Sequence, residues 1–358
     1  MDMRACVAMS GGVDSSVAAV LLLQQGYELS GVNLRMFHNE DLGQSRERTC
    51  CSLADAEDAA LVARRLGFPF YVFDFSQVFR DTVIRNFVQE YQAGRTPNPC
   101  AECNRSVKFG ALLQRARTLG CDYLATGHYA RVEQDPASGR YLLKRAADRS
   151  KDQTYFLYML TQEQLAHTLF PLGGLRKTEV RQIAEAHDLV NARKHDSQDI
   201  CFVPDGKYAD FIERTVGSPA PAGPFLDREG RVLGRHKGLI RYTLGQHKGL
   251  GLSTEEPLYV LEKDAAANTI RLGPDSALWT RQLTAEQVNL ISLPELTAPL
   301  RVTAKTRYSQ RESAAVLEPL SGGQVRLTFD EPQRAITPGQ AVVFYDGDVV
   351  VGGGIVRE

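Results

Sequence analysis

Apolar runs alternate with amphipathic stretches over the first 127 residues of the chain. The runs that predict buried strands are Ala5–Met9, Leu29–Phe37, Pro69–Phe75 and Asp122–Thr126. Apolar residues at helical spacing predict further helices over Leu53–Leu66, Val78–Tyr91, Val107–Leu119, Thr154–Leu160 and Lys177–His187. Strands that alternate with helices indicate an α/β fold with a doubly wound parallel sheet. In such a sheet the ligand lies outside the carboxyl ends of the strands.

The pattern changes after Gly206, where helical periodicity almost vanishes. Short strands separated by turn residues are typical of a small barrel or sandwich. They are predicted at Tyr259–Leu261, Thr269–Leu272, Gln287–Asn289, Leu300–Lys305, Ala314–Leu317, Gln324–Phe329, Ala341–Tyr345 and Val349–Val356. We therefore expect an α/β domain over residues 1–206, a small interposed domain over 207–280 and a C-terminal β-barrel over 281–358.

Composition limits the possible classes of protein. The chain has 358 residues, of which 43% are hydrophobic and 24% charged, as in soluble globular proteins. No apolar run approaches the ~20 residues that span a bilayer, so we expect no membrane association. The net charge is −1, so any nucleic-acid surface must be a local patch. The seven cysteines all lie in the first 201 residues, and this odd, uneven set favours a reducing cytoplasm over a disulfide framework.

The stretch Ser10–Ser16, Ser-Gly-Gly-Val-Asp-Ser-Ser, joins the first strand to an apolar helix that ends at Gly26. A helix that begins at a glycine turn directs free N–H groups and its positive dipole end at a bound anion. The three serine hydroxyls would add donors. The stretch therefore predicts a phosphate site, although no Walker lysine follows it. The alternative is a plain strand–helix connection in which the glycines only make the turn.

Other polar positions also follow predicted strand ends. Met36 ends the second strand and Gly127 follows the fourth, so we expect both to meet the Ser10–Ser16 stretch around one nucleotide. The polar residues 38–49 are predicted to form a loop that covers this site.

Two prolines precede the pair Cys100 and Cys103 and predict a rigid loop. Asn104 is expected to cap a helix directly after Cys103, whose dipole would lower the pKa of the Cys103 thiol. The same Cys-x-x-Cys spacing also suits half of a zinc site or a redox pair. Cys201 is either a buried cysteine or a reactive thiol.

Two basic stretches stand out in the second half of the chain. The segment Arg231–Leu252 contains no acidic residue and offers Tyr242 as a stacking surface. A second cluster lies beside Tyr308 and consists of Arg301, Lys305, Arg307 and Arg311. Each is either a solvated loop or a surface that follows a phosphate backbone.

Several long motifs resemble those of the tRNA-specific 2-thiouridylase family of PP-loop ATP pyrophosphatases. They are Met9–Ser16, Cys51–Ala56, Gly94–Pro99, Ala125–Arg131, Lys151–Leu157, Asp199–Phe202, Arg307-Tyr308 and Thr337–Gln340. The resemblance implies an ATP site made of Ala8, Met9, Ser10, Gly11, Gly12, Val13, Asp14 and Ser15, with Met36 and Gly127. It also implies Mg²⁺ near the polyphosphate, with Asp14 as the plausible carboxylate.

The resemblance further implies a two-step reaction on tRNA. ATP would adenylate O2 of the wobble uridine, and sulfur would then replace that oxygen. Cys201 would carry the sulfur as a persulfide that a sulfur-relay protein reloads, and Cys103 would be the nucleophile that closes a transient disulfide with Cys201. The target base would meet Asn98, Pro99 and Cys100. The residues implied to contact the rest of the tRNA are His128, Lys151, Asp152, Gln153, Arg307, Tyr308 and Gln340.

One departure from the family pattern is Cys100, where some members carry aspartate. Cys100, Cys103 and Cys201 could then hold an iron–sulfur cluster that delivers the sulfur. Two rival functions also share the ATP loop: a synthetase that adenylates another oxygen for attack by an amine or ammonia, and a tRNA-binding protein without catalysis. The synthetase has no use for Cys103 and Cys201, and tRNA-dependent release of pyrophosphate would exclude the tRNA-binding protein.

Overall fold

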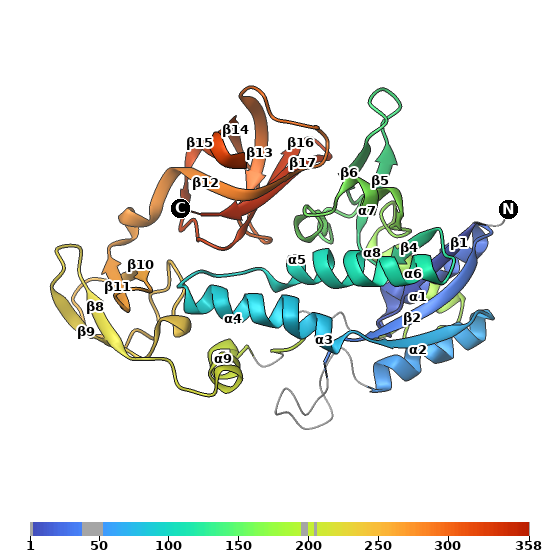
Figure 1. The fold of residues 1–358 in the computed structure, drawn as a ribbon, viewed down its shortest axis with the longest axis horizontal. Coiled ribbons are helices and arrows are strands. Elements are labelled where there is room, and N and C mark those ends of the chain that lie inside the picture. Colours follow the sequence, from blue (N-terminus) through green and yellow to red (C-terminus); the bar gives the residue numbers. More distant parts are fainter. Residues whose placement is uncertain (1–2, 38–52, 195–199, 204–205, 358) are drawn as a thin grey trace. The chain divides into compact units, whose positions relative to one another are not determined.

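The computed structural model describes residues 3–37, 53–194, 200–203 and 206–357 (Figure 1). The predicted covering loop at 38–49 lies outside the described residues, as do Cys50, Cys51 and Asp199. The chain divides into two compact units. The first comprises Met1–Ile84, Pro99–Gly206 and Asp348–Val350, and the second comprises Arg85–Asn98, Lys207–Gly347 and Val351–Glu358.

The first unit contains the predicted parallel sheet, with strand order β3-β2-β1-β4-β7. Its strands are β1 (Arg4–Ala8), β2 (Glu28–Arg35), β3 (Phe70–Asp74), β4 (Tyr123–Thr126) and β7 (Thr168–Leu169). Ala8 at the end of β1 pairs with Val32 on one side and Thr126 on the other, so neighbouring strands end at the same edge. The α/β fold class is confirmed.

Helix α1 (Val13–Gln24) is apolar at every position from Val17 to Leu23 and forms the centre of this unit's core. The same core includes residues of the sheet, of α2 (Leu53–Leu66) and of α8 (Lys177–Ala186). Because neighbours cover most of its surface, α1 needs no polar face. The other elements of this unit are α3 (Ser76–Phe79), α5 (Pro99–Cys103), α6 (Leu113–Thr118), α7 (Gln162–Ala166), β5 (Ala130–Gln134) and β6 (Tyr141–Arg145).

Two predicted helices of this unit have other bounds. The helix expected at Thr154–Leu160 is wrong, since only Thr154–Phe156 forms a 3₁₀ turn. The helix expected from Val107 begins at Pro99, because proline suits the first helical position, where its missing N–H is no loss. A π-helical segment, Asn104–Leu112, continues α5 into α6.

The middle of the chain, in the second unit, forms a sheet with strand order β10-β11-β8-β9. The strands are β8 (Gly223–Leu226), β9 (Val232–His236), β10 (Tyr259–Asp264) and β11 (Thr269–Gly273). The same unit holds α4 (Arg85–Gln92) and α9 (Tyr208–Val216). Helical periodicity almost vanishes from the sequence after Gly206, yet α9 forms there; it buries Phe211 and Ile212 and ends at Gly217 in the left-handed conformation.

The C-terminal strands form the predicted β-barrel. They are β12 (Trp279–Leu290), β13 (Leu300–Lys305), β14 (Ser313–Pro319), β15 (Val325–Arg334), β16 (Ala341–Asp346) and β17 (Val349–Val356). They pair in the order β12-β15-β14-β13-β16-β17, and the pairing of β12 with β17 closes the ring. Its interior contains Leu283, Phe329 and Phe344. Across the described ranges, none of the helices has the length and apolarity to cross a membrane.

Candidate active site

The turn between β1 and α1 depends on Gly11. Its φ is +76°, in the left-handed region that favours glycine. A Cβ at this position would lie 2.2 Å from the carbonyl oxygen of Asp55, in the first turn of α2. Gly12 forms the N-cap of α1, and among the described residues no side chain caps this helix end. The first N–H groups of α1 are therefore available to an anion.

The hydroxyl groups of two serines stabilise this turn by hydrogen bonds within it. Ser15 Oγ donates to the carbonyl of Gly12 at 3.1 Å and accepts from the N–H of Ser10 at 3.3 Å. Ser16 Oγ also donates to Gly12, at 3.1 Å. The expectation of three donor hydroxyls directed at a ligand is therefore wrong for Ser15 and Ser16, while Ser10 is exposed.

Asp14, in the first turn of α1, is held by a lysine from a distant part of the chain. Lys177 Nζ lies 2.7 and 2.8 Å from the two carboxylate oxygens of Asp14. Tyr129 Oη donates to the same carboxylate at 2.8 Å. Since both oxygens already accept charged or neutral donors, Asp14 as placed does not fit the role of a Mg²⁺ ligand.

A second lysine reaches the turn from the other side. Lys194 Nζ lies 3.2 Å from the carbonyl of Gly11 and 2.6 Å from carboxylate oxygens of both Asp55 and Asp58. Burial alone would lower the pKa of Lys194, but the hydrogen bonds to Asp55 and Asp58 raise it. Asn191 Nδ2 adds a bond to the Gly11 carbonyl at 3.0 Å. Two ammonium groups thus flank the predicted phosphate loop, which has no lysine of its own, and no local sequence motif indicates either of them.

Gly127 lies against the same turn. A Cβ on Gly127 would be 2.7 Å from the N–H nitrogen of Ser15, so only glycine allows this approach. The adjacent His128 is partly buried, and its Nδ1 lies 2.7 Å from Thr126 Oγ1. Burial and the nearby Lys108 lower the pKa of His128 well below its usual value, so the ring is neutral at pH 7.

The strand ends that flank the turn are mostly interior. Met9 is fully buried, and its carbonyl accepts a hydrogen bond from Asn33 Nδ2 at 2.8 Å. Val13 is also part of the core, whereas Ala8 is half-buried. Among the residues expected around the nucleotide, the backbone of the turn and Gly127 therefore present the accessible groups, and Met9 and Val13 support them.

Cys103 is the last residue of α5, not the residue before a helix. Its φ of −60° and ψ of −42° are helical, and the helix continues through Asn104. The expected lowering of the Cys103 pKa is therefore wrong: burial raises it to about 11, although Lys108 acts in the opposite direction. The thiol Sγ lies 3.8 Å from Met36 Sδ. Asn104, expected as a cap, donates instead to the carbonyl of Phe156 at 3.0 Å.

The other two thiols differ in exposure. Cys100 is exposed and Cys201 is half-buried. Aromatic contacts bring the residue after Cys201 towards the residue after Met36: the Phe79 ring lies 5.6 Å from Phe202 and 5.9 Å from Phe37. The described residues include no disulfide and no group of three His, Cys, Asp or Glu side chains placed to hold a metal ion. As placed, Cys100, Cys103 and Cys201 therefore do not fit a cluster site.

Three family models match the chain end to end. They are described as the tRNA methyl transferase HUP domain (residues 3–205), the tRNA methyl transferase PRC-barrel domain (209–274) and the aminomethyltransferase beta-barrel domain (280–356). The tRNA-specific 2-thiouridylase MnmA of Acetivibrio thermocellus is 50% identical over 355 residues, which cover 99% of each chain. That of Moorella thermoacetica is 53% identical over 351 residues, 98% of each chain. The chain belongs to the tRNA-specific 2-thiouridylase family.

The segment Lys151–Gln153, which the family resemblance assigns to tRNA contact, is tightly bound inside the first unit. Asp152 is buried and accepts hydrogen bonds from the N–H of Ala146 at 3.0 Å and from Thr154 Oγ1 at 2.6 Å. Gln153 Oε1 accepts from the N–H of Tyr129 at 2.9 Å. Lys151 is half-buried. Asp152 and Gln153 therefore fix this segment to Ala146, directly after β6, and to Tyr129, directly before β5.

Three of the residues assigned to tRNA contact lie in the barrel of the second unit: Arg307 and Tyr308 follow β13, and Gln340 directly precedes β16. Arg307 donates to the carbonyl of Ala335 at 2.7 Å, and Tyr308 is 40% exposed. Gln340 Nε2 donates to the carbonyl of Thr96 at 2.9 Å. Asn98 is half-buried in this unit, and Pro99 and Cys100 follow it as the first residues of α5.

Three side chains of the two basic stretches are bound or buried within the protein, so they are less available to a nucleic acid than the sequence suggests. Arg241 pairs with Asp210 and Glu213, and Arg301 pairs with Asp330. Tyr242 is only 4% exposed, because its ring packs against Phe225 and His236 in the core of the middle sheet. The expectation that Tyr242 offers a stacking surface is wrong.

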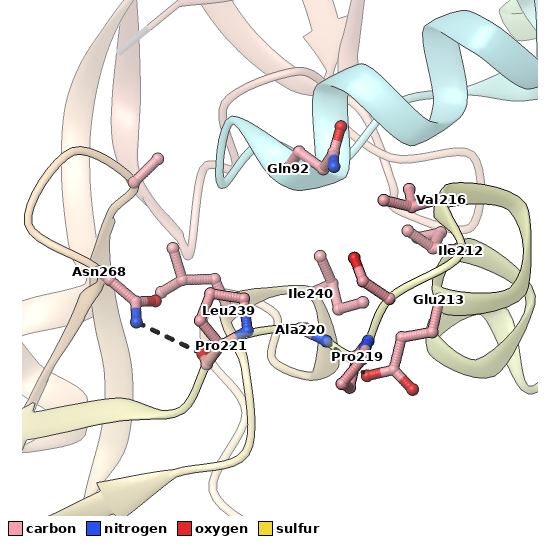
Figure 2. Close-up of a pocket in the computed structure, with 12 residues that line it drawn as sticks. Gln92, Ile212, Glu213, Val216, Pro219, Ala220, Pro221, Leu239, Ile240 and Asn268 are labelled. Atoms are coloured by element: carbon pink, nitrogen blue, oxygen red, sulfur yellow. Dashed lines mark hydrogen bonds between the residues drawn. The ribbon is translucent and has the colours of Figure 1, made fainter.

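A pocket of about 220 Å³ lies in the second unit (Figure 2). Its walls come from the end of α4, from α9, from residues 218–221 and from the turn at Leu239-Ile240. Most of the lining is apolar, and Glu213 at its wall is already bound to Arg241 and to the N–H of Ala220. None of the residues expected to bind ATP or tRNA lines this pocket.

Proposed function

We propose that the protein uses ATP to replace O2 of the wobble uridine of tRNA with sulfur. The membership of the 2-thiouridylase family supports this function. The single observation that carries the chemistry is the turn at Gly11, where no side chain caps the N–H groups of α1 and the ammonium groups of Lys177 and Lys194 lie on either side. This arrangement suits the β- and γ-phosphates of ATP, which leave together as pyrophosphate.

In the first step, the uridine O2 attacks the α-phosphorus of ATP. The O2–P bond forms as the bond to the bridging oxygen of pyrophosphate breaks. The ring carbonyl of uridine is a poor electrophile, and adenylation converts its oxygen into a leaving group. Donors at the N-terminus of α1 stabilise the charge that develops on the departing pyrophosphate.

In the second step, Cys201 carries the sulfur as a persulfide. The thiolate of Cys103 attacks Sγ of Cys201, forms the Cys103–Cys201 disulfide and releases hydrosulfide. Hydrosulfide adds to C2 of the uridine and expels AMP, which leaves with the original O2, and a proton is lost. A thiol reductant must then reduce the disulfide, and a sulfur-relay protein must reload Cys201. Both partners are expected in the cytoplasm.

The environment of Cys103 sets a requirement on this step. Because the Cys103 pKa is raised to about 11, the thiol is protonated at pH 7 in the protein without substrates. The thiolate is the reactive form, so a proton must leave Cys103 before it attacks. The positive charge of Lys108 favours the thiolate and therefore favours the loss of this proton.

The test is a thiolation assay with ATP, a persulfide donor and an unmodified tRNA that carries U34. Mass spectrometry of the nucleosides should find 2-thiouridine, and one pyrophosphate should be released per thiolated tRNA. Cys103→Ser and Cys201→Ser should retain pyrophosphate release and lose thiolation. Cys121→Ala, at a buried cysteine outside the site, is the matched control. Thiolation by both serine variants would refute the mechanism.

The same assay separates the alternatives. An iron–sulfur route through Cys100, Cys103 and Cys201 predicts iron and acid-labile sulfide in anaerobically purified, active protein. A synthetase that uses ammonia would release pyrophosphate without incorporating sulfur. A tRNA-binding protein without catalysis would release no pyrophosphate at all.

A further inference from the structure

The helix that carries Cys103 changes its hydrogen-bond pattern directly after that residue. From Asn104 to Leu112 it is a π-helix of nine residues, in which an N–H bonds the carbonyl five positions back instead of four. The spacing is visible at Gly110, where a Cβ would lie 2.9 Å from the carbonyl oxygen of Arg105. π-Helical turns are rare and occur frequently at functional sites. The change of pattern decides which side chains share a face with the Cys103 thiol.

Lys108 is the side chain that the π-helix brings to this face. Cys103 and Lys108 are five positions apart. In an α-helix, with about 3.6 residues per turn, five positions would turn Lys108 about 140° away from Cys103. In a π-helix five positions complete about one turn, so the two side chains project from the same side of the helix. The electrostatics agree: burial raises the pKa of the Cys103 thiol, and the charge of Lys108 acts against burial.

The ammonium group of Lys108 has no counter-ion among the residues that the structure describes. Its side chain is half-buried and forms no hydrogen bond or ion pair with any of them. The next residue, Phe109, packs with its ring centre 5.9 Å from that of His128, whose imidazole is neutral at pH 7. Glu102, an acid on the same helix, is already bound by Arg105. A charge that is partly removed from water and left unpaired is unfavourable, so Lys108 would stabilise an anion that forms beside it.

We propose that Lys108 is a positioning residue that acts through Cys103, as the counter-ion of its thiolate. The thiolate is the form of cysteine that attacks another sulfur. The other described neighbours do not favour it: Cys100 and Glu102 oppose its negative charge, and Met36, which follows β2, contributes an uncharged sulfur at 3.8 Å. The part that Lys108 takes in sulfur transfer rests on the proposed function, whereas its effect on the thiol does not.

The test is the rate at which iodoacetamide alkylates Cys103 in the full-length protein without substrates, followed by peptide mass spectrometry at about pH 9. The reactive form is the thiolate, so the rate follows the thiolate population. Lys108→Met keeps an unbranched side chain of similar length and removes the charge. We expect Cys103 alkylation to slow about tenfold in this variant, because a nearby opposite charge shifts such an equilibrium by at least about that factor.

Two further variants separate charge from packing. Lys108→Arg keeps the positive charge and should restore the alkylation rate to within about twofold of the wild type. Arg117→Gln is the matched control, since it removes an exposed positive charge from α6, further along the same continuous helix. Faster alkylation of Cys103 in Lys108→Met would overturn the proposal, because it would mean that Lys108 only covers the thiol. An unchanged rate would overturn it as well.

A second readout follows the reaction itself. In single turnover with ATP, unmodified tRNA and protein loaded with persulfide, the thiolation rate should fall about tenfold in Lys108→Met and recover in Lys108→Arg. A loss of pyrophosphate release as large as the loss of thiolation would assign Lys108 to the ATP step and overturn the proposal. If the wild type thiolates no tRNA while the alkylation rates differ as expected, the proposed function fails and the effect of Lys108 on Cys103 stands.

Discussion

Lys177 Nζ lies within 2.8 Å of both carboxylate oxygens of Asp14, at the end of α1 where the phosphate loop presents its N–H groups. The side chain of Lys177 is 11% exposed, and its ammonium group lies 5.8 Å from the centre of the Tyr129 ring. An ammonium group so placed neutralises Asp14 and leaves the helix end positive, which favours a polyphosphate.

Replacement of Lys177 by methionine should therefore abolish most of the ATP chemistry. The variant leaves Asp14 without its cation and adds a negative charge beside the phosphates. We expect pyrophosphate release to fall about 100-fold, the lower end of the effect seen when one hydrogen-bond donor to a developing anion is removed. Lys144→Met is the matched control, because Lys144 also pairs with a carboxylate, that of Glu133, outside the site. Equal activity of the two variants would contradict the role of Lys177.

Alanine substitutions at Gly11 and at Gly67 form a matched pair that tests the close approach of the turn to α2. Gly11 and Gly67 have similar backbone angles, with φ of +76° and +81°. A Cβ on Gly67 would meet nothing within 4 Å, whereas one on Gly11 would collide with Asp55. Gly67→Ala should therefore lower stability by about 1–2 kcal/mol, the cost of a left-handed alanine, and keep pyrophosphate release. Gly11→Ala should lower stability further and lose pyrophosphate release.

Chemical denaturation with a parallel pyrophosphate assay measures both effects. If Gly11→Ala were no less stable than Gly67→Ala, the close approach of the turn to α2 would be contradicted. If its stability fell but pyrophosphate release survived, the turn would have no part in binding ATP.

The parallel sheet and the glycine turn between its first strand and α1 could be predicted because their signals are local. A run such as Ala5–Met9 is apolar at every position, as a strand covered on both faces must be. The contacts that complete the site are not local: Lys177 lies 163 positions from Asp14, and Lys194 lies 183 positions from Gly11. A single sequence, analysed without comparison to related sequences, does not indicate which distant residues form such pairs.

The errors have physical reasons too. The sequence predicts Cys103 in a rigid loop before a helix, with Asn104 as the cap, yet Pro99 starts that helix and the cysteine becomes part of it. Tyr242 lies in a basic stretch, which suggests a surface, but the ring faces Phe225 and His236 inside the middle sheet. In both cases tertiary packing, which local composition does not reveal, determines the environment of the side chain.

Binding to tRNA should depend on salt, because arginine and lysine displace counterions from phosphates. The logarithm of the association constant should fall with the logarithm of salt concentration by about 0.7–0.9 for each phosphate neutralised. Arg311→Gln should reduce this slope by about 1, since Arg311 is exposed and forms no ion pair with a described residue. A salt-independent dissociation constant would show that these basic stretches do not face the nucleic acid.

The pKa of Cys103 leads to a pH-dependent prediction for the protein without substrates. Burial favours the neutral thiol, so alkylation of Cys103 by iodoacetamide should be slow at pH 7 and increase up to a midpoint near its pKa of about 11. The exposed Cys100 should be alkylated faster at pH 7. Because the folded-state pKa is raised above the ordinary value of 9.0, Cys103 stabilises the fold below pH 9, and this contribution disappears as the pH rises towards 11. Peptide mass spectrometry at each pH follows the two cysteines separately. Rapid alkylation of Cys103 at pH 7 would mean that the thiolate already exists in the protein without substrates, and that loss of a proton does not limit the transfer of sulfur.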